Sequence, residues 1–354
     1  MNSLSQKYLS SLAFSAQQVS TLRSLGECRG RQALYERQRP EVLESLRTIA
    51  AIESTDSSNR LEGITAPEAR IKDLVLHNSK PRNRSEQEIA GYRDTLQLIH
   101  ESRKDMPVTV NVTVNVIGQL HARIYSHLAE DCGHWKPVDN DIVERGADGQ
   151  ILRVRFHAVS AVATPQAMDA LLQRYVAAEQ NRQEPLMLIP LFVLDFLCIH
   201  PFRDGNGRVA RLITLLLLYH FGYEVGRFIS LERIFEKTKE SYYETLEASS
   251  QGWHTAEHNV NPWLNYFWGV LQRAYNEFEE RVGQIGSGRG SKSQQVREAV
   301  TRKLGSFAIS DLERDCPGVS KETIRSVLQK MRDEGIVEMR GRGRGARWRQ
   351  TGGA

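Results

Sequence analysis

The sequence HPFRDGNGRVAR, residues 200–211, separates two strongly apolar segments, 185–199 and 207–219. Pro185 suits the first turn of a helix, and the apolar residues of both segments predict buried helices. The longest apolar run, 186–199, has about 14 residues, fewer than the ~20 that a membrane-spanning helix needs. The sequence therefore predicts a helical core in which two buried helices present a short polar loop.

This loop combines groups that suit a phosphate ligand. It offers the imidazole of His200, the carboxylate of Asp204 and two glycines, Gly205 and Gly207, that let the backbone approach a ligand closely. The first N–H groups of the following helix have no partner inside that helix, and the helix dipole adds partial positive charge there. Such a helix start is a ready anion site. The alternative is an ordinary structural turn, because Asp-Gly and Asn-Gly are common turn dipeptides.

The polar residues of the loop also predict a reaction type. Arg208 and Arg211 are three apart on the second helix, so we expect both guanidinium groups on one side, facing phosphate oxygens. His200 titrates near neutral pH and could take a proton from an attacking hydroxyl. Asp204 alone cannot form a protein-only metal site, but it suits Mg²⁺ that shares nucleotide phosphates. The pattern indicates phosphoryl-type transfer.

Residues 200–211 resemble the signature of the Fic (Fic/Doc) family, H-P-F-x-[D/E]-G-N-G-R-x-x-R, at every fixed position. The resemblance covers roughly residues 10–285, including a helical N-terminal region typical of the longer bacterial members. It implies a mainly α fold, a helical bundle with a small β-hairpin flap, and transfer of AMP from ATP to a Tyr, Ser or Thr hydroxyl of a protein, this chain included. Doc-type kinases have Lys at the second glycine, so Gly207 favours AMP transfer over phosphorylation.

The resemblance also implies roles for single residues. His200 is the expected general base and Asp204 the expected Mg²⁺ ligand. Phe202 is expected to anchor the loop by packing. The expected phosphate-binding residues are Gly205, Asn206, Gly207, Arg208 and Arg211.

Two further segments resemble family elements. Val138–Val143 and Ile151–Phe156 predict a hairpin around the turn 147–149. The hairpin stands where the family has a flap that binds the target by strand addition. The expected docking residues are Arg153, Val154, Arg155, Phe156, His157, Ala158 and Val159. Segment 236–246 resembles the region that covers adenine, with Tyr242 and Tyr243 beside the base. A structural hairpin and plain core aromatics are the alternatives.

Residues 58–63, SNRLEG, resemble the family's inhibitory pattern [S/T]-x-x-x-E-[G/N]. We expect a short helix that starts near Asp56 and ends at Gly63, after a longer helix that starts at Pro40. Ser58 and Glu62 are four apart and share a face. Glu62 could then form a bidentate pair with Arg211 and withhold the arginine that orients the γ-phosphate. The alternative is a capped surface helix.

Positive charge is concentrated at the C-terminal end. Of the net charge of +4, residues 288–354 contribute +7, with 15 Lys and Arg against 8 Asp and Glu. Residues 310–313 and Ser320 predict the starts of two helices, and two strands follow around 341–345. This order resembles a winged helix-turn-helix, which implies DNA as a partner. The expected DNA-binding residues are Lys321, Arg325, Gln329, Arg340, Arg342 and Arg344.

We therefore expect three domains: an N-terminal helical region with the inhibitory helix (1–105), a catalytic core (106–285), and a winged-helix domain (286–354) after a Gly/Ser/Arg-rich linker that starts at 281. Four scattered cysteines and the absence of a secretory signal suit the cytoplasm. The leading hypothesis is an autoinhibited, Mg-ATP-dependent protein adenylyltransferase. A nucleotide-sensing transcriptional regulator, and phosphoryl or other nucleotidyl transfer, stay open. So do a protein-binding winged helix and a homodimer.

Overall fold

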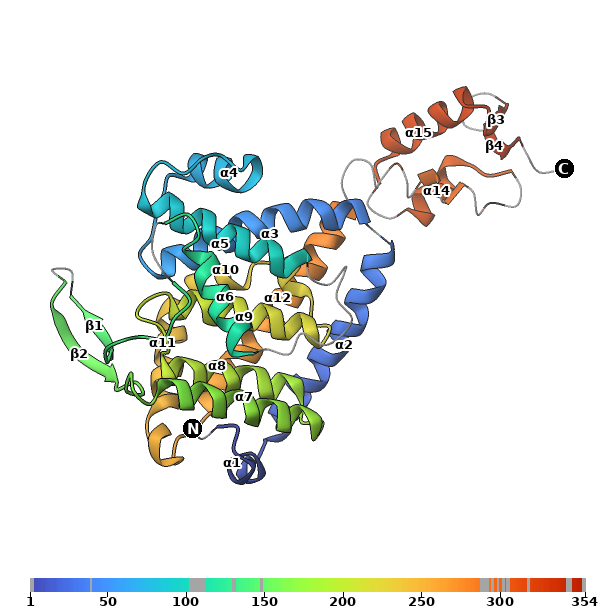
Figure 1. The fold of residues 1–354 in the computed structure, drawn as a ribbon. Coiled ribbons are helices and arrows are strands. Elements are labelled where there is room, and N and C mark those ends of the chain that lie inside the picture. The colour runs from blue at the N-terminus through green and yellow to red at the C-terminus, as the bar shows by residue number, and fades with distance from the viewer. Residues whose placement is uncertain are drawn as a thin grey trace. The chain divides into compact units, whose positions relative to one another are not determined.

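The computed structural model describes residues 3–38, 40–101, 113–128, 132–146, 149–286, 293, 296–297, 299–300, 303, 306–316, 319–341 and 346–351. The chain forms two compact units, Met1–Phe278 and Glu279–Ala354. The fold is mainly α, as expected, and the first unit is a bundle of helices with one β-hairpin (Figure 1). The expected N-terminal region and catalytic core both lie within this first unit.

The helices of the first unit follow one another with short connections. Their bounds are α1 Gln6–Ser11, α2 Ala16–Gln38, α3 Pro40–Leu61, α4 Glu68–His77, α5 Arg84–Glu101, α6 Val114–Ile124, α7 Thr164–Gln180, α8 Pro185–Ile199, α9 Asn206–His220, α10 Leu231–Lys237, α11 Lys239–Ser250 and α12 Asn261–Gly286, with 3₁₀ turns η1 Val225–Arg227 and η2 Trp253–Thr255.

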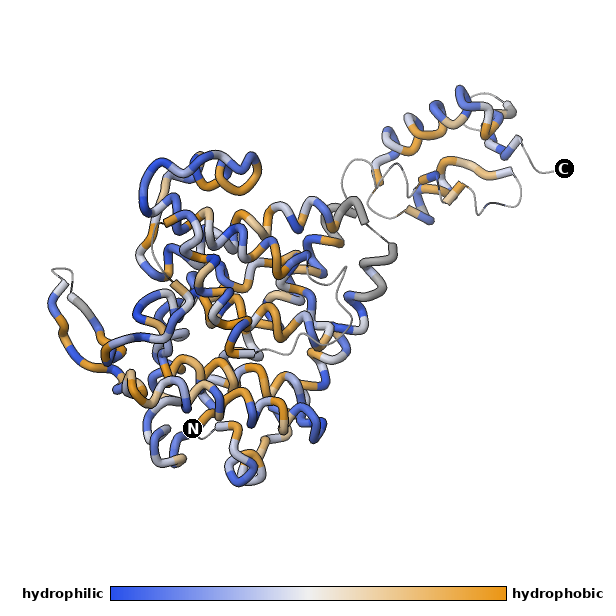
Figure 2. Tube along the Cα trace, viewed as in Figure 1, coloured by the Kyte–Doolittle hydropathy of each residue, from blue (hydrophilic) through white to orange (hydrophobic). Residues whose placement is uncertain are grey.

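The two apolar helices expected from the sequence form the centre of this unit. Helices α8 and α9 are apolar along most of their lengths (Figure 2), and they pack against each other. Pro190 lies inside α8 and has no N–H, so the carbonyl of Leu186 loses its helical partner. The indole N–H of Trp268 in α12 donates to that carbonyl at 2.7 Å. Tertiary packing thus satisfies the polar group that the proline leaves open.

Helix α3 differs from the sequence-based expectation. The prediction of a separate short helix from Asp56 is wrong, because α3 runs unbroken from Pro40 to Leu61. The polar residues that could have capped a new helix have other partners: Asn59 Nδ2 donates to the Thr55 carbonyl at 2.8 Å, and Asp56 pairs with Arg60. Gly63 has φ +79°, so the predicted stop is in place.

The predicted hairpin is present but shorter. Strands β1 (Ile142–Arg145) and β2 (Ile151–Phe156) pair antiparallel and project from the helices (Figure 1). Val138–Asp141 is not a strand, which corrects the predicted start. Lys136 and Asn140 anchor this preceding segment through hydrogen bonds to the carbonyls of Ile199 and Phe202. Of the predicted turn, residues 147 and 148 lie outside the described residues.

The second unit has its own core. It contains α14 (Ile309–Asp315), α15 (Lys321–Asp333) and the antiparallel pair β3 (Val337–Arg340) and β4 (Arg347–Gln350). Ser320 caps α15 as expected, but α14 starts after Ala308, whose N–H donates to Asp311, so Ser310 is not its cap. The expected linker start, 281–286, is instead the last part of α12. Among the described helices, none is long and apolar enough to cross a membrane.

Candidate active site

The loop between α8 and α9 is held by its own side chains. His200 ends α8 in a left-handed conformation, φ +52°, and its N–H donates to the Phe196 carbonyl. The Asn206 side chain accepts from Phe202 N at 2.9 Å and donates to Phe202 O at 2.7 Å. The amide of Asn206 therefore closes the loop on itself, and the loop keeps one shape. Any contact of Asn206 with a phosphate would come from its backbone.

Phe202 and His121 form a second support below the loop. The fully buried Phe202 stacks on His121 of α6, with ring centroids 3.9 Å apart. His121 Nδ1 accepts from Gly133 N, so Nε2 carries the proton and donates to the Asp204 carbonyl at 3.1 Å. Burial lowers the pKa of His121 to about 4, which keeps the ring neutral. Phe202 packs as expected, but no sequence pattern singled out His121.

Both glycines of the loop are required by close neighbours. Gly205 has φ +75°, and a Cβ there would lie 2.8 Å from the Tyr125 hydroxyl. A Cβ at Gly207 would lie 2.2 Å from Glu62 Oε1. The Glu62 carboxylate thus lies directly over the first turn of α9, where the sequence predicted an anion site.

Arg211 is bound by the end of α3. Its Nε donates to Ser58 Oγ, and its Nη2 donates to Ser58 O and to Glu62 Oε1, each at 2.8 Å. The predicted contact of Glu62 with Arg211 is present, but it is not bidentate, because Ser58 takes the other donors. Burial disfavours the charge on Arg211, yet Glu62 and the nearby tyrosines raise its pKa above the ordinary value.

Arg208 has a different set of partners. The side chain is fully buried, and its Nη1 lies 2.8 Å from Glu88 Oε2 of α5. Its Nη2 donates to the Tyr125 hydroxyl at 2.7 Å. We expected both arginines to face phosphate oxygens, whereas here Arg208 is bound within the protein. The sequence carried no signal for Glu88, whose position depends on how α5 packs against α9.

A cavity of about 210 Å³ brings many of the predicted residues together. Helix α11 contributes Tyr242 and Tyr243, and the Tyr243 hydroxyl donates to Leu61 O at 3.3 Å. The predicted site residues that line the cavity are His200, Gly207, Arg211, Tyr242, Tyr243, Glu62, Arg155 and Phe156. The volume is below the range of about 300–1,000 Å³ typical of small-molecule pockets, and Glu62 takes part of the space.

His200 is neutral in this environment. Burial first, and then the charge of Lys136, lower its pKa to about 4. His200 Nδ1 lies 3.4 Å from the Leu197 carbonyl, which can only accept, so Nδ1 carries the proton. Nε2 is then left as a proton acceptor. Lys136 was not predicted as a site residue, and its Nζ donates to Ile199 O and Asn140 Oδ1.

Asp204 is exposed at the start of the loop's second half. Its Oδ1 accepts from Gly205 N at 2.7 Å. Among the described residues there is no group of three or more His, Cys, Asp or Glu side chains that could hold a metal ion. The donor set therefore fits a cation with one protein ligand and several water or phosphate oxygens, such as Mg²⁺.

The hairpin residues lie beside α11. Arg153 and Arg155 both pair with Glu144 and with Glu247 of α11. The buried ring of Phe156 stacks on His254, and His157 pairs with Asp141 at 2.9 Å. The amide of Val159 lies 3.4 Å from the Cys198 carbonyl, and Ala158 is partly buried. The exposed apolar side chains of the hairpin are Ile151, Leu152 and Val154.

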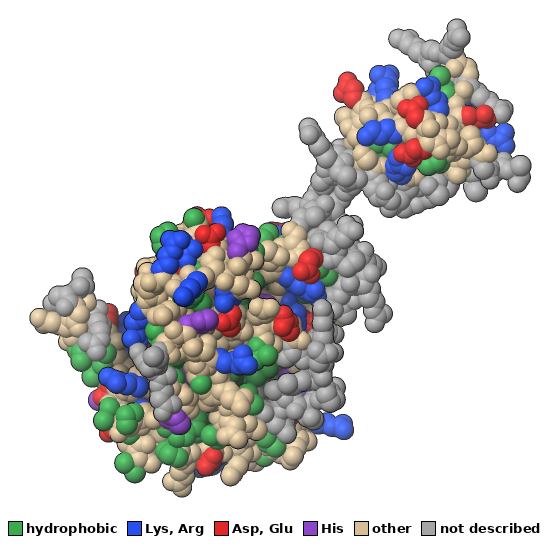
Figure 3. Space-filling view, turned by 45° about the horizontal axis from the view of Figure 1, so that its top comes forward, with side chains coloured by type: hydrophobic (Ala, Val, Ile, Leu, Met, Phe, Trp, Pro, Cys, Tyr) green, Lys and Arg blue, Asp and Glu red, His purple; other side chains and the backbone are tan. Residues whose placement is uncertain are grey.

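The expected DNA-binding residues are described only in part. Lys321, Arg325 and Gln329 are exposed on α15, and Lys321 lies 3.3 Å from Glu313. Figure 3 shows basic and acidic side chains interspersed on the visible face of this unit. Arg340 begins the turn after β3, and Arg342 and Arg344 lie outside the described residues.

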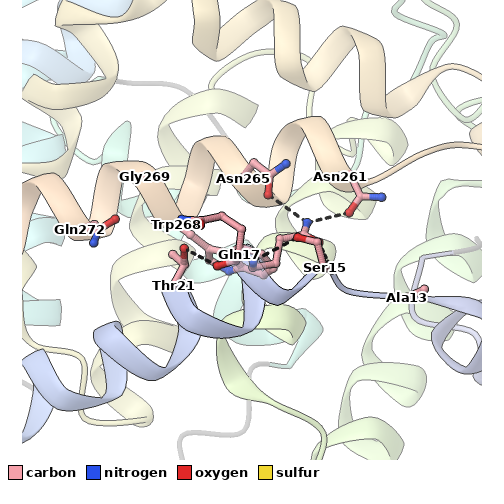
Figure 4. Close-up of a pocket in the computed structure, with 10 residues that line it drawn as sticks. Ala13, Ser15, Gln17, Thr21, Asn261, Asn265, Trp268, Gly269 and Gln272 are labelled. Atoms are coloured by element: carbon pink, nitrogen blue, oxygen red, sulfur yellow. Dashed lines mark hydrogen bonds between the residues drawn. The ribbon is translucent and has the colours of Figure 1, made fainter.

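Another hollow of about 540 Å³ lies between the start of α2 and α12 (Figure 4). Its described lining has no charged residue, and Gln18 Nε2 donates to Asn261 and Asn265 across it. None of the predicted site residues lines this hollow. It offers no titratable group for chemistry, so the cavity at His200 is the candidate active site.

Comparisons with known proteins agree with this geometry. The sequence profile of the Fic/DOC family matches residues 111–218. A protein adenylyltransferase Fic of Nematostella vectensis is 22% identical over 62% of this chain and 47% of its own length, and one of Drosophila grimshawi is 26% identical over 40% of this chain and 26% of its own. The chain thus spans less than half the length of these curated relatives.

Solved structures share the fold. A Fic family protein of Desulfovibrio desulfuricans superposes with a TM-score of 0.62 at 20% identity, covering 97% of this chain and 98% of its own. A Fic domain containing signaling protein of Bacteroides thetaiotaomicron gives 0.58 at 24% identity, over 76% of this chain and 96% of its own. With the HPFRDGNGRVAR loop between its two buried helices, this chain is therefore a mainly helical protein that carries a Fic/DOC family domain.

Proposed function

We propose that this protein is a protein adenylyltransferase that transfers AMP from ATP to a side-chain hydroxyl and that Glu62 restrains it. The observation that carries the proposal is the single cavity lined by His200, Gly207, Arg211 and Glu62. The names of the curated relatives support the same reaction. Transfer of AMP forms a bond from the target oxygen to the α-phosphorus and breaks the bond from that phosphorus to diphosphate.

In this proposal His200 is the general base. Its Nε2 is unprotonated and its ring is oriented by the Leu197 carbonyl, so it can accept the proton of the target hydroxyl. The low pKa of about 4 keeps this nitrogen free at neutral pH. The bound triphosphate would add negative charge nearby and raise that pKa toward the range of an efficient base.

The start of α9 would bind the phosphates. Its first N–H groups and the guanidinium of Arg211 offer donors on one side of the cavity. Gly205 and Gly207 leave room for that approach. Asp204 would hold Mg²⁺, which would neutralise phosphate charge when bound. Tyr242 and Tyr243 would border the base of the nucleotide, and Arg208 would stabilise α9 through Glu88.

Glu62 is proposed as the inhibitor. Its carboxylate lies against Gly207 and Arg211, where a phosphate would otherwise be bound. A triphosphate that enters beside this carboxylate loses the contact with Arg211 and meets like charge. Misplacement of the α-phosphorus by about 1 Å can cost about 100-fold in rate, which corresponds to about 2.7 kcal/mol. The hairpin is proposed to dock the target segment by strand addition along β2.

Labelling with ATP tests the proposed reaction. Full-length protein is incubated with Mg²⁺ and ATP labelled at the α- or the γ-phosphate, and intact mass reports an added AMP. We expect α-label and one or more AMP masses on the protein, and no label in His200→Ala. Transfer of the γ-label would instead indicate a kinase, and nucleotide binding without any transfer would favour a nucleotide-sensing regulator.

We further propose that the second unit binds DNA through α15. The face opposite its buried residues presents Lys321, Arg325 and Gln329, all exposed. A gel shift with full-length protein and with Lys321→Gln/Arg325→Gln tests this. The double substitution should weaken binding and reduce its salt dependence. Equal affinity of both proteins would reject DNA binding by this face and favour a protein partner.

A further inference from the structure

A second cavity lies away from the candidate active site. It measures about 680 Å³ and is lined by α3, α4, α5 and the 3₁₀ turn η1. It shares no lining residue with the cavity at His200. Its depth is formed by buried residues such as Arg227 and Leu96, whereas Leu76 and Gln97 at its rim are exposed. The cavity is therefore open to small molecules from solvent.

Three polar side chains in this cavity have buried atoms without a hydrogen-bond partner among the described residues. These atoms are Arg227 Nε and Nη2, Thr55 Oγ1 and His100 Nε2. Buried polar groups nearly always have partners, and each one left without costs about 1–3 kcal/mol. Their convergence on one cavity indicates a ligand that supplies the missing partners.

The guanidinium of Arg227 is held in a fixed position. The side chain is 5% exposed, its Nη1 donates to the His100 carbonyl, and it lies 4.2 Å from the centre of the Tyr219 ring. Glu224 Oε2 lies 3.6 Å from Nε, too far for a hydrogen bond. Two donors of a rigid, charged fork therefore remain available, the arrangement that suits phosphate or carboxylate oxygens.

The other charges around the cavity lie nearer its rim. Arg47 is partly exposed and pairs with Glu44 at 3.3 Å, and Glu101 accepts from Gln97. Arg93 binds Asp94 and the Leu74 carbonyl. Burial, with the charges of Arg227 and Arg47, lowers the pKa of His100 to about 3, so its ring is neutral. Two further arginines thus surround the entrance, and a neutral imidazole lies beside Arg227.

We propose that this cavity binds the phosphate group of a small molecule, with Arg227, Thr55 and His100 as its ligands. Arg227 donates two hydrogen bonds, and the hydroxyl of Thr55 and the imidazole of His100 add two more. Val75, Leu76 and Leu96 form an apolar wall, and the volume of 680 Å³ leaves room for an organic group attached to the phosphate. The site does not depend on the proposed transfer activity.

Isothermal titration of the full chain tests the site without any nucleotide. The probes are ribose 5-phosphate, inorganic phosphate and ribose. We expect saturable binding of a phosphate-bearing probe and none of ribose. Thr55→Val and Arg227→Gln should each weaken it about tenfold, about 1.4 kcal/mol. Ala51→Leu, which fills the cavity without changing charge, should abolish it. Arg211→Gln at the active site and the exposed Arg23→Gln serve as controls and should leave it unchanged.

Each outcome decides the proposal. Tighter binding of ribose 5-phosphate than of inorganic phosphate supports an ester ligand, and equal binding supports free phosphate. No saturable binding by either phosphate, or binding that Ala51→Leu and Thr55→Val leave unchanged, overturns the site. Binding lost in Arg211→Gln would place the phosphate at the active site and would also overturn it. Thermal melting establishes that each variant folds, and Thr55→Val keeps the test valid if Arg227→Gln does not.

Discussion

Helix α9 carries two ion pairs that look alike and differ in one respect. Arg208 lies 2.8 Å from Glu88, and Arg211 lies 2.8 Å from Glu62. Both arginines are buried. The Glu88 side chain is 7% exposed, whereas the Glu62 side chain is 25% exposed. The two acids therefore differ in how much of the fold must move to release them.

The origin of each acid explains this difference. Glu88 comes from α5, which packs against α3, α6 and α9, so its removal from Arg208 requires the core to open. Glu62 follows the last residue of α3 and precedes Gly63, whose φ of +79° ends the helix. Movement of this last turn alone would free Arg211. One pair thus stabilises the fold, and the other is suited to be opened.

The largest expected effect is on stability, from Glu88→Ala. Loss of the carboxylate leaves the fully buried charge of Arg208 without its acid, which typically costs about 3–5 kcal/mol. Glu62→Ala should cost less than about 1 kcal/mol, because its partner keeps both contacts to Ser58. Urea unfolding at pH 7 measures both values. Similar losses for the two variants would show that the pairs do not differ as argued.

The next effect is on activity, from Glu62→Gly. If Glu62 blocks productive binding of the triphosphate, its removal should raise self-labelling from α-labelled ATP about 100-fold. Glu62→Gln tests charge against shape and should give a smaller increase. The double variant Glu62→Gly/His200→Ala gives the background rate. Unchanged labelling in Glu62→Gly would reject autoinhibition while leaving the transferase proposal intact.

The sequence was most informative where function is local. Residues 200–211 are contiguous, so their loop and its helical flanks could be predicted directly, and so could the meeting of Glu62 with Arg211 from the family pattern. The partners of these residues could not be predicted. Glu88, His121 and Lys136 reach the loop from α5, α6 and the segment before β1, at positions that only packing determines. For the same reason Arg208, a phosphate ligand in the signature, is bound here to Glu88.

A smaller effect of pH compares the histidines on the two sides of α9. His121 near Arg208 and His200 near Glu62 both have pKa values of about 4 in the folded protein, below the unfolded value of 6.5. As pH falls through 6.5, the unfolded chain binds protons that the folded chain does not, so stability is lost. Between pH 7.5 and 5.5 each ring should cost about 1.4 kcal/mol.

Urea unfolding at the two pH values measures this loss. His121→Gln and His200→Gln should each reduce it by about 1 kcal/mol. A reduction in one variant and not in the other would show that the two sides of α9 differ in burial as well as in their ion pairs.

The smallest change expected is from Ser58→Ala, which separates the two contacts that α3 makes with Arg211. The substitution removes the hydroxyl that accepts from Arg211 Nε, while Ser58 O and Glu62 still hold Nη2. Loss of one such hydrogen bond should cost about 1 kcal/mol and raise self-labelling a few-fold. Ser57→Ala, on the same turn of α3, is the matched control. An increase as large as that of Glu62→Gly would mean that Ser58 positions the glutamate, because an independent contact could not release the whole restraint.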